Sequence, residues 1–399
     1  MRPGRPICLM STFPPQPCGL ATYSAELSRA IVASGRTVVV LAERGGANGT
    51  HDGVVVRPAW HRGDDWVDSV VAAARAEDAA VLHLQYTPDT LGWDDRVPRL
   101  LDACRRHGLP TAVTLHTVHT AATGLVEGRL RPARYHRLLA NRADVVIVHG
   151  ESSQADVLRR HGVQDEKIEV IAHGTPAPRL PGRDESRASL GLPGTGPVLL
   201  YFGFVHMLKN VHTLLRAMVD VVARRPDARL VIAGSIQNRG WYNRLYVRAC
   251  RALIGPLGLS TQVSWREGYV APDHVPALYA AADLVLLPHS QGYGSASGVM
   301  HYALGAGKLV LCSASRKFAE IGEQVSRDLQ VATWDARAWA ASIDRLLSDE
   351  HERATLLARL REYAERTSWP AVASRHGRVY DRIQHETSTH TRNERDDLR

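Results

Sequence analysis

Short apolar runs alternate with amphipathic stretches along most of the chain, in two successive series. The apolar runs of the first series are residues 7–11, 37–42, 54–57, 80–84, 111–116, 144–149 and 168–172. Segments such as 20–33 and 96–107, which separate them, have the apolar spacing of helices. Strands that alternate with helices are typical of a parallel sheet covered by helices on both faces. The first series therefore predicts a doubly wound, Rossmann-like α/β domain.

The alternation stops between residues 174 and 197, where Pro, Gly and charged residues dominate, and then restarts. Apolar runs of the second series are residues 198–202, 229–233, 263–265, 284–287, 309–312 and 329–332. The interruption is typical of an interdomain linker. A second Rossmann-like domain follows from the restarted pattern.

These patterns define the domain organisation. We assign residues 1–178 to an N-terminal domain and residues 190–366 to a C-terminal domain, and we expect a helix at about 368–384 to pack back on the first. Residues 385–399 are polar and lack apolar anchors, so we expect a disordered tail. In open α/β sheets ligands bind at the carboxyl ends of the strands, and the predicted site is a cleft where the two sheets face each other.

Composition excludes several classes of protein. The five cysteines are scattered without CxxC pairs, which predicts a reducing cytoplasm and neither disulfides nor a zinc site. No apolar run is long enough for a signal peptide or a membrane span. The net charge is +8, but the chain has no dense basic run with interleaved aromatic residues, so we do not expect nucleic-acid binding.

Two loops of the first domain carry candidate chemistry. A proline-rich loop follows the first strand and enters its helix at Gly19, where free backbone N–H groups would bind an anion or a sugar hydroxyl. The alternative is that Gly19 only permits a tight turn. The loop is not a G-x-G-x-x-G sequence, so we expect no dinucleotide cofactor. His116 ends the fifth strand and is predicted to reach the ligand, with a structural histidine as the alternative.

Two loops of the second domain point to a phosphate. Lys209 precedes a helix, where a cation is unfavourable unless an anion lies nearby, although a solvated surface lysine is the alternative. Residues 288–308 contain glycines and serines that join a strand to a helix. Such a segment suits a nest of N–H donors around a diphosphate. The alternative is a flexible loop before a close-packed helix.

Read in order, these segments resemble the family-4 retaining GT-B glycosyltransferases over nearly the whole chain. The resemblance rests on Phe13-Pro14-Pro15, Cys18-Gly19-Leu20-Ala21-Thr22-Tyr23, His83-Leu84-Gln85-Tyr86, Thr114-Leu115-His116-Thr117, Val170-Ile171-Ala172-His173-Gly174 and Ser297-Gly298-Val299. Trp369 with Val379-Tyr380 also resembles the closing helix that returns to the first domain.

The resemblance implies a site with named parts. The first domain would hold the acceptor and the second the sugar nucleotide, without a metal or a covalent nucleophile. Three residues would be catalytic: His116 touching the donor sugar, Gly19 beside the leaving phosphate, and Lys209 on the diphosphate. The other implied donor-binding residues are Gly203, His206, Gly294, Ser295, Ser297, Gly298, Val299, Tyr302 and Glu320. The implied acceptor-binding residues are Thr22, Tyr86 and His119.

The sequence departs from this family at the donor site. The paired glutamates of the E-x7-E motif are absent, with Gln291 near the first position and Tyr302 near the one that usually binds ribose. Glu320 or backbone groups would then hold the ribose. The arginine that usually accompanies the diphosphate lysine is replaced by His206 or Phe204.

The leading hypothesis is a retaining, metal-independent glycosyltransferase that moves a sugar from a UDP- or GDP-sugar to a small-molecule acceptor in the biosynthesis of specialised metabolites. A lipid-linked or polysaccharide acceptor is the related alternative. The missing glutamates motivate an alternative from a different class, in which the protein is a non-catalytic GT-B subunit that binds a sugar nucleotide. A sugar-nucleotide epimerase is less favoured, because the motifs lack suitable carboxylates. The oligomeric state is left open, a homodimer included.

Overall fold

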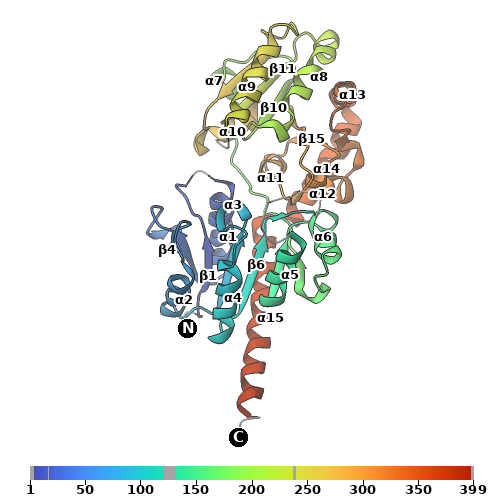
Figure 1. Ribbon diagram of the computed structural model, residues 1–399. Coiled ribbons are helices and arrows are strands. Elements are labelled where there is room, and N and C mark those ends of the chain that lie inside the picture. Colours follow the sequence, from blue (N-terminus) through green and yellow to red (C-terminus); the bar gives the residue numbers. More distant parts are fainter. Residues whose placement is uncertain (1–3, 17, 121–131, 237–239, 397–399) are drawn as a thin grey trace. The chain divides into compact units, whose positions relative to one another are not determined.

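The computed structural model describes residues 4–16, 18–120, 132–236 and 240–396, and side chains up to residue 389 (Figure 1). Contacts divide the chain into two units. The N-terminal unit consists of residues 1–174, 293–296 and 367–399, and the C-terminal unit of residues 175–292 and 297–366. The division falls at the beginning of the segment that the sequence marks as a linker. Each unit is a Rossmann-like α/β domain, as predicted.

The N-terminal unit contains an eight-stranded sheet in the order β3-β4-β2-β1-β5-β6-β8-β9. The strands are β1 (Ile7–Ser11), β2 (Val38–Glu43), β3 (Gly49–His51), β4 (Val54–Trp60), β5 (Val81–Tyr86), β6 (Thr111–Leu115), β8 (Val145–Val148) and β9 (Ile168–Val170). All pairs are parallel except β3 with β4. Every residue of β1, β2 and β5 is buried, which explains the apolar runs in β1 and β2. In β5 the buried His83 and Gln85 interrupt the apolar run.

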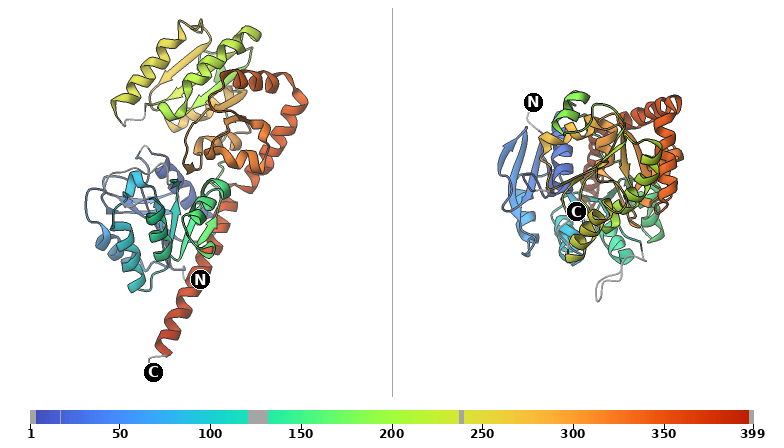
Figure 2. Two further views of the ribbon diagram at one scale, coloured as in Figure 1. Left: turned by 45° about the vertical axis from the view of Figure 1, so that its right-hand side comes forward. Right: turned by 90° about the horizontal axis from the view of Figure 1, so that it is seen from above.

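Helices cover both faces of this sheet (Figures 1 and 2). The helices of the unit are α1 (Gly19–Ala33), α2 (Val67–Ala76), α3 (Pro88–Leu91), α4 (Arg96–Arg106), α5 (Pro132–Arg142), α6 (Asp156–Arg160) and α15 (Trp369–Asp396), with short helical turns η2 (Glu151–Ala155) and η3 (Asp165–Lys167). Alternate residues of β1 serve the two faces: Met10 packs with the core under α2, α4 and α5, and Leu9 with the core under α1 and α15.

Helix α15 corrects one expectation. Residues 385–399 are predicted to be disordered, but the helix continues to Asp396. Its apolar anchoring ends at Ile383. Beyond that residue, the hydroxyls of Thr387, Ser388 and Thr389 donate to carbonyls one turn earlier. Extending a helix that is already docked avoids the free-energy cost of nucleation. The distribution of apolar residues does not indicate this effect, so it does not predict the extended helix.

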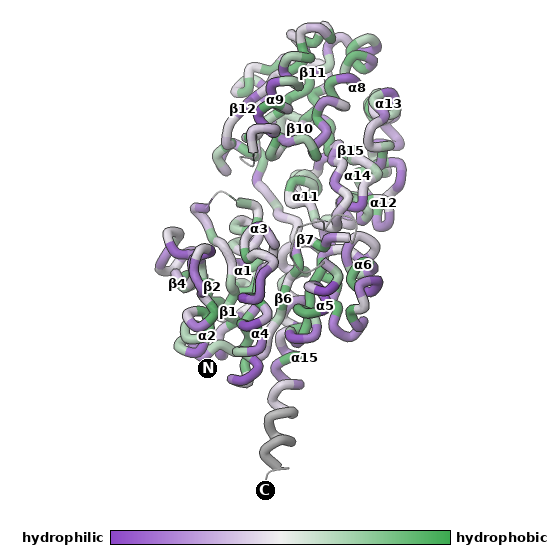
Figure 3. Tube along the Cα trace, viewed as in Figure 1, coloured by the Kyte–Doolittle hydropathy of each residue, from purple (hydrophilic) through white to green (hydrophobic). Residues whose placement is uncertain are grey.

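The C-terminal unit contains a six-stranded parallel sheet in the order β12-β11-β10-β13-β15-β16. Its strands are β10 (Val198–Phe202), β11 (Arg229–Gly234), β12 (Val263–Glu267), β13 (Leu284–Leu287), β15 (Leu309–Ser313) and β16 (Gln330–Val331). Its helices are α7 (Arg183–Ser189), α8 (Val211–Arg224), α9 (Trp241–Ile254), α10 (Val275–Ala281), α11 (Gly298–Gly305), α12 (Ala319–Gln324), α13 (Ala336–Ser348) and α14 (Glu350–Arg366), with turns η4 (Met207–Lys209), η5 (Pro272–His274), η6 (Arg316–Phe318) and η7 (Arg327–Leu329). Figure 3 shows hydrophobic residues concentrated along the central strands.

Helix α7 ties the predicted linker to the C-terminal unit through Arg187. The Arg187 side chain has no exposed surface, and its Nη2 donates to Asp283 at 2.7 Å. Its other nitrogens donate to main-chain carbonyls of Ala281, Gly194 and Gly196. The Asp283 carboxylate also accepts the N–H of Val198, the first residue of β10. The linker is therefore a folded part of this unit.

In the part of the chain that the structure describes, no helix has the length and apolar character needed to cross a membrane.

Candidate functional site

His116 follows β6 at the carboxyl edge of the N-terminal sheet, and both of its ring nitrogens are engaged. Nε2 lies 2.8 Å from Gln85 Oε1, and Nδ1 lies 3.1 Å from Nε2 of His149. The ring of Tyr23 packs edge-on against His116 with 4.6 Å between centroids. A sugar would therefore contact the carbon atoms at the edge of the imidazole ring. To bond a ring nitrogen, it would have to replace Gln85 or His149 as the partner.

Two histidines lie around His116: His149 is buried and His173 is half-buried. His149 also contacts the carbonyl of Ile171 through Nδ1 at 3.0 Å, and His173 packs on the Tyr23 ring. Burial lowers the pKa of His116 well below its ordinary value, and the neighbouring His149 lowers it further. His116 is therefore a neutral imidazole at pH 7 in this structure. The sequence singles out His116 but gives no sign of its partnership with His149.

Gly19 is the first residue of α1, and Cys18 is the helix cap, with its Sγ accepting the N–H of Ala21 at 3.3 Å. No atom lies within 4 Å of the position that a Cβ at Gly19 would take. In the described part of the chain, a larger side chain at position 19 would therefore meet no steric conflict, so packing does not explain the glycine. Thr22 is exposed on the same first turns of α1, with its hydroxyl 3.4 Å from the carbonyl of Cys18.

The predicted acceptor residues differ in accessibility. Tyr86 is fully buried and donates its hydroxyl to the carbonyl of Gly92 at 2.6 Å, a position that suits packing and not the predicted contact with an acceptor. His119 is half-buried, with its ring 5.4 Å from Trp93 and 5.1 Å from Tyr293. Of the two, His119 has the surface that an acceptor could touch.

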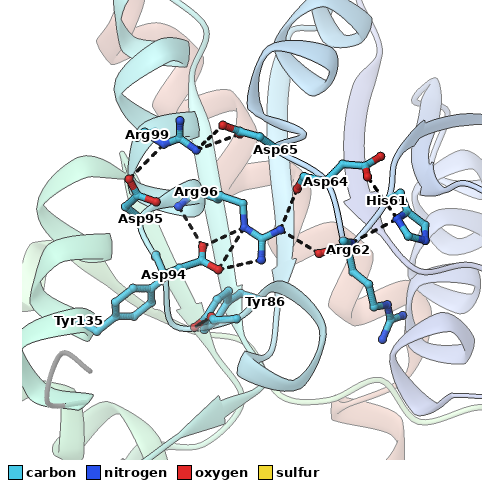
Figure 4. A network of polar contacts seen from close by, with 12 residues as sticks. His61, Arg62, Asp64, Asp65, Tyr86, Asp94, Asp95, Arg96, Arg99 and Tyr135 are labelled. Carbon is cyan, nitrogen blue, oxygen red and sulfur yellow. Dashed lines mark hydrogen bonds and ion pairs between the residues drawn. The ribbon is translucent and has the colours of Figure 1, made fainter. Parts of the chain in front are cut away.

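A network of ion pairs holds the loops beside Tyr86 (Figure 4). Arg96 pairs with Asp94 at 2.7 Å and donates to the main-chain carbonyls of Arg62 and Asp64. It thereby connects the loop after β4 to the start of α4. Glu43, at the end of β2, joins Arg62 of this loop to Gln16 of the loop after β1.

Arg62 is a polar residue of this edge that the motifs do not indicate. Its Nε donates to Glu43 Oε1 at 2.6 Å, and Gln16 Nε2 donates to Glu43 Oε2 at 3.3 Å. Burial alone would raise the pKa of Glu43, but the hydrogen bonds and charge of Arg62 bring it below its ordinary value. The Arg62 side chain itself remains half-exposed. No periodic or glycine pattern marks such a pair, so the sequence could not reveal it.

Gly294 and Ser295 are predicted to line the donor diphosphate, but the structure places them in the N-terminal unit. They form β14 (Gly294–Ser295), which pairs antiparallel with β7 (Thr117–Val118). A Cβ at Gly294 would lie 2.0 Å from the carbonyl oxygen of Ser153. Glycine is therefore required there by close backbone packing, and the predicted nest is shorter than the run of small residues suggests.

In the C-terminal unit, the turn after β10 approaches the beginning of α11. Gly203 has a φ of 125°, and a Cβ there would lie 3.4 Å from Val299 Cγ2. Ser297 caps α11, with its Oγ accepting the N–H of Met300 at 3.4 Å, and Gly298 and Val299 form the first turn. The predicted donor residues Gly203 and Val299 thus lie together at the carboxyl edge of the sheet.

Lys209 ends η4 at this edge. Its neighbour Asn210 is fully buried in a left-handed conformation and donates to the carbonyl of Thr333 at 2.7 Å, which fixes the start of α8. Lys209 is half-buried, and its Nζ lies 3.4 Å from His289 Nδ1. Within the described ranges no carboxylate forms an ion pair with it. Burial lowers the pKa of Lys209 well below its ordinary value, and the charge of Lys317 lowers it further.

Three other predicted donor-binding residues differ in burial and in their contacts. His206 is buried before η4. Tyr302 is half-buried on α11, with its ring 4.7 Å from that of Tyr279. Glu320 lies between His301 Nε2 at 3.5 Å and the hydroxyl of Tyr363, which donates to it. Because these contacts engage both carboxylate oxygens of Glu320, ribose would have to compete with them.

His289 is a site residue that the motifs do not indicate. It follows β13 and is almost fully buried, with its ring 5.1 Å from that of Phe318. The rule that selects His116, a polar residue directly after a parallel strand, would also have selected His289. Lys317, on the turn after β15, is buried as well.

Two family models match adjoining parts of the chain. Residues 17–178 match the model described as Glycosyltransferase Family 4, and residues 182–367 match Glycosyl transferases group 1. A D-inositol 3-phosphate glycosyltransferase of Corynebacterium urealyticum is 27% identical over 67% of this chain and 65% of its own length. The corresponding protein of Salinispora arenicola is 28% identical over 68% and 63%. The chain thus spans slightly less than two thirds of these curated relatives.

Solved structures have the same fold. Sucrose-phosphate synthase from Thermosynechococcus elongatus has a TM-score of 0.75 at 21% identity, covering 95% of this chain and 99% of that one. The HepE protein of Anabaena in complex with UDP has a TM-score of 0.72 at 18% identity, covering 94% and 99%. The predicted resemblance is confirmed: the chain belongs to the family-4 glycosyltransferases and has the GT-B fold.

Proposed function

We propose that this protein is a retaining glycosyltransferase that moves a sugar from a UDP- or GDP-sugar to a small hydroxylated acceptor. The observation that carries the proposal is Lys209. It is a half-buried cation at the carboxyl edge of the C-terminal sheet, without a carboxylate partner in the described chain. The N-terminus of α11 lies at the same edge. Both features favour an anion there, and a diphosphate leaving group supplies one.

The proposed reaction breaks the bond between the sugar C1 and the diphosphate oxygen, and it forms a bond between C1 and the acceptor oxygen on the same face of the ring. The acceptor proton goes to the departing phosphate oxygen. Negative charge develops on the diphosphate, and Lys209 with the N–H groups of the first turn of α11 would stabilise it. The neutral His116 would contact the sugar, and positioning would supply the rest of the rate enhancement.

Names of similar proteins support the choice of substrates. Solved structures of similar fold hold UDP, UDP-glucose or UDP-2-fluoro glucose, which favours a uridine donor. The curated relatives are named for D-inositol 3-phosphate. A small polyol or its phosphate is therefore the first acceptor to test.

The test begins with donor binding. We expect UDP or GDP to raise the melting temperature of the full chain, because a ligand that binds only the folded state stabilises it. Transfer from the matching sugar nucleotide to inositol 3-phosphate and to neutral polyols is then followed by mass spectrometry, with the anomeric configuration of the product read by NMR. Inversion at C1 would refute the retaining mechanism.

The Lys209→Ala variant connects the activity to the site. We expect it to lower kcat/KM at least 100-fold, because a hydrogen bond to a charged group contributes about 1.5–3 kcal/mol and more charge develops in the transition state. Lys308→Met removes the same charge at the opposite edge of the sheet, where the Nζ of Lys308 donates to main-chain carbonyls of Ala280 and Ala282. Equal loss in both variants would refute the role of Lys209. Nucleotide binding without transfer to any acceptor would favour a non-catalytic subunit instead.

A further inference from the structure

A cavity of about 440 Å³ lies in the N-terminal unit, between the edge strand β9 and the helix α15, which runs along this unit in Figure 1. None of the residues that line it belongs to the predicted catalytic, donor-binding or acceptor-binding set. We call it the arginine pocket, and its lining residues are Glu169 and Val170 of β9 and Arg375, Arg378, Val379 and Arg382 of α15.

Positive charge is in excess in the arginine pocket. Three of the six lining residues are arginines, spaced so that they share one face of α15, and one is acidic. Arg382 pairs with that acid, Glu169, at 3.1 Å. Among the described residues, Arg375 and Arg378 have no carboxylate partner, and Arg378 donates to the hydroxyl of Ser374. Two positive charges of the lining are therefore not compensated within it.

The strand side of the pocket adds a main-chain donor. β9 is the last strand of its sheet. The N–H of Ile171 donates to the carbonyl of Val148 on β8 at 2.9 Å. Because the main-chain groups of successive strand residues point to opposite sides, the N–H and carbonyl of Val170 point away from β8, toward the open edge. The N–H is thus a donor on the same side as the three guanidinium groups.

An exposed arginine on a helix is common and alone does not indicate a site. Two features distinguish this face of α15. Its arginines border a concave volume within the size range of small-molecule sites, and the strand across that volume leaves two of the three charges unpaired. Phosphate fits such a lining, since its oxygens accept and the planar guanidinium group binds them in pairs.

We propose that the arginine pocket binds the phosphate group of a small phosphorylated molecule, with Arg375 and Arg378 as its main contacts. The site goes beyond the proposed sugar transfer, in which none of these residues takes part. The same phosphate chemistry occurs in soluble metabolites and in phospholipid headgroups, and the experiments below separate these two sources.

Isothermal titration calorimetry with sn-glycerol 3-phosphate tests the pocket in the full chain. The double variant Arg375→Met/Arg378→Met should weaken binding about 10- to 100-fold, because each hydrogen bond to a charged group changes affinity by roughly tenfold. The matched control is Arg75→Met/Arg106→Met, which removes two exposed arginines from α2 and α4 of the same unit. It should leave the Kd unchanged. Equal weakening in both variants would show unspecific attraction and overturn the proposal.

The acid of the pocket gives a test in the opposite direction. Glu169→Gln releases Arg382 from its ion pair, so it should tighten binding of sn-glycerol 3-phosphate about two- to fivefold, as expected for an exposed pair. A variant that fails to fold cannot bind more tightly than wild type. An unchanged Kd in this variant would overturn the proposal.

A further measurement needs only the wild-type protein. Phenylglyoxal modifies exposed arginines, and peptide mass spectrometry follows each of them. We expect sn-glycerol 3-phosphate to reduce labelling of Arg375 and Arg378 several-fold and to leave Arg75 and Arg106 unchanged. Labelling of Arg375 and Arg378 that ignores the ligand would overturn the proposal.

Vesicles of phosphatidylcholine that contain phosphatidic acid distinguish the two phosphate sources. Sedimentation with these vesicles that requires Arg375 and Arg378 would support the pocket and assign it to a lipid headgroup. Binding of sn-glycerol 3-phosphate without sedimentation would support a soluble ligand. Single-stranded RNA that binds wild type more tightly than sn-glycerol 3-phosphate, and is weakened equally by both double variants, would overturn the proposal in favour of a nucleic-acid surface.

One variant separates the pocket from the proposed function. Lys209→Ala should lower sugar transfer and leave the Kd for sn-glycerol 3-phosphate unchanged. Binding that depends on Arg375 and Arg378 in a protein without transferase activity would support the pocket and refute the transferase. Transfer at the wild-type rate in a protein that does not bind sn-glycerol 3-phosphate would support the transferase and overturn the pocket.

Discussion

Replacing Arg187 with methionine should destabilise the C-terminal unit far more than any change to a surface arginine. The Arg187 side chain is fully buried, and its ion pair with Asp283 is also the contact that holds the first residue of β10. The substitution leaves the Asp283 carboxylate without its buried partner. It also leaves three main-chain carbonyls, those of Ala281, Gly194 and Gly196, without their donor.

The structure gives the expected size of this effect. Removing one partner of a buried pair costs about 3–5 kcal/mol. Asp283 is 28% exposed and keeps its ion pair with Arg183, but three main-chain carbonyls also lose their donor, so we use the same range here. For a unit of this size, each kcal/mol lowers the melting temperature by about 2–4 °C. Arg187→Met should therefore lower the melting temperature of the C-terminal unit by roughly 6–20 °C. Arg187→Lys should recover only part of the loss, because one ammonium group cannot reach all of these acceptors.

Arg183 provides the matched control. It lies on the same helix and pairs with the same carboxylate at 3.2 Å, but its side chain is 48% exposed. Exposed ion pairs contribute about 0–1 kcal/mol, so Arg183→Met should be nearly neutral. Urea unfolding with hydrogen exchange read on the peptides of α7 and β10 distinguishes this unit from the other. Equal losses from the two substitutions, or less than 1 kcal/mol from Arg187→Met, would refute the reasoning.

Three further changes test other parts of the structure. Tyr86→Phe removes one hydrogen bond to Gly92 and should cost about 1 kcal/mol of unfolding free energy without changing the KM for the acceptor; a rise in KM would restore Tyr86 as an acceptor contact. Gly305→Ala places a Cβ 1.7 Å from the carbonyl oxygen of Pro176, so the melting temperature should fall by several degrees, whereas a neutral result would mean that the linker shifts freely. Burial lowers the pKa of Lys317 to about 8 from 10.5, so the unfolded chain binds more protons between these values and stability without ligand should rise with pH across this window. The shift corresponds to about 3 kcal/mol. Lys317→Met should reduce the rise by about this amount, and urea unfolding at pH 7.5 and 10.5 checks it.

The sequence predicts most of the two sheets, because most of the buried parallel strands appear as apolar runs. Runs such as 7–11 and 309–312 lie within one residue of the strands in the structure. The predicted positions of His116 and Lys209 at the carboxyl edges follow from the same rule. The contacts between side chains could not be predicted in this way. The contacts of His116 with His149 and of Lys209 with His289 join residues far apart in sequence, so no local pattern encodes them.

Two expectations differ from the structure for related reasons. The run of small residues from 292 to 298 suggests one phosphate nest, but Gly294 is required for packing against Ser153 and only the end of the run caps α11. Glycine permits a ligand and a neighbouring backbone to approach equally well, so the residue type alone cannot distinguish them. The tail is helical and not disordered because α15 extends from the docked residues before 384, which the composition of the tail does not indicate.

The return of α15 to the N-terminal unit has a consequence for synthesis on the ribosome. Trp369, Val372 and Tyr380 belong to the core that α1 covers, and Trp369 fills the space next to Gly174. The first 174 residues emerge long before these side chains do. During that interval one face of the nascent sheet is incompletely covered, so a chain stopped early should attract chaperones or aggregate. The segment from Trp369 to Ile383 therefore provides the closing step of assembly for the part of the protein that is made first.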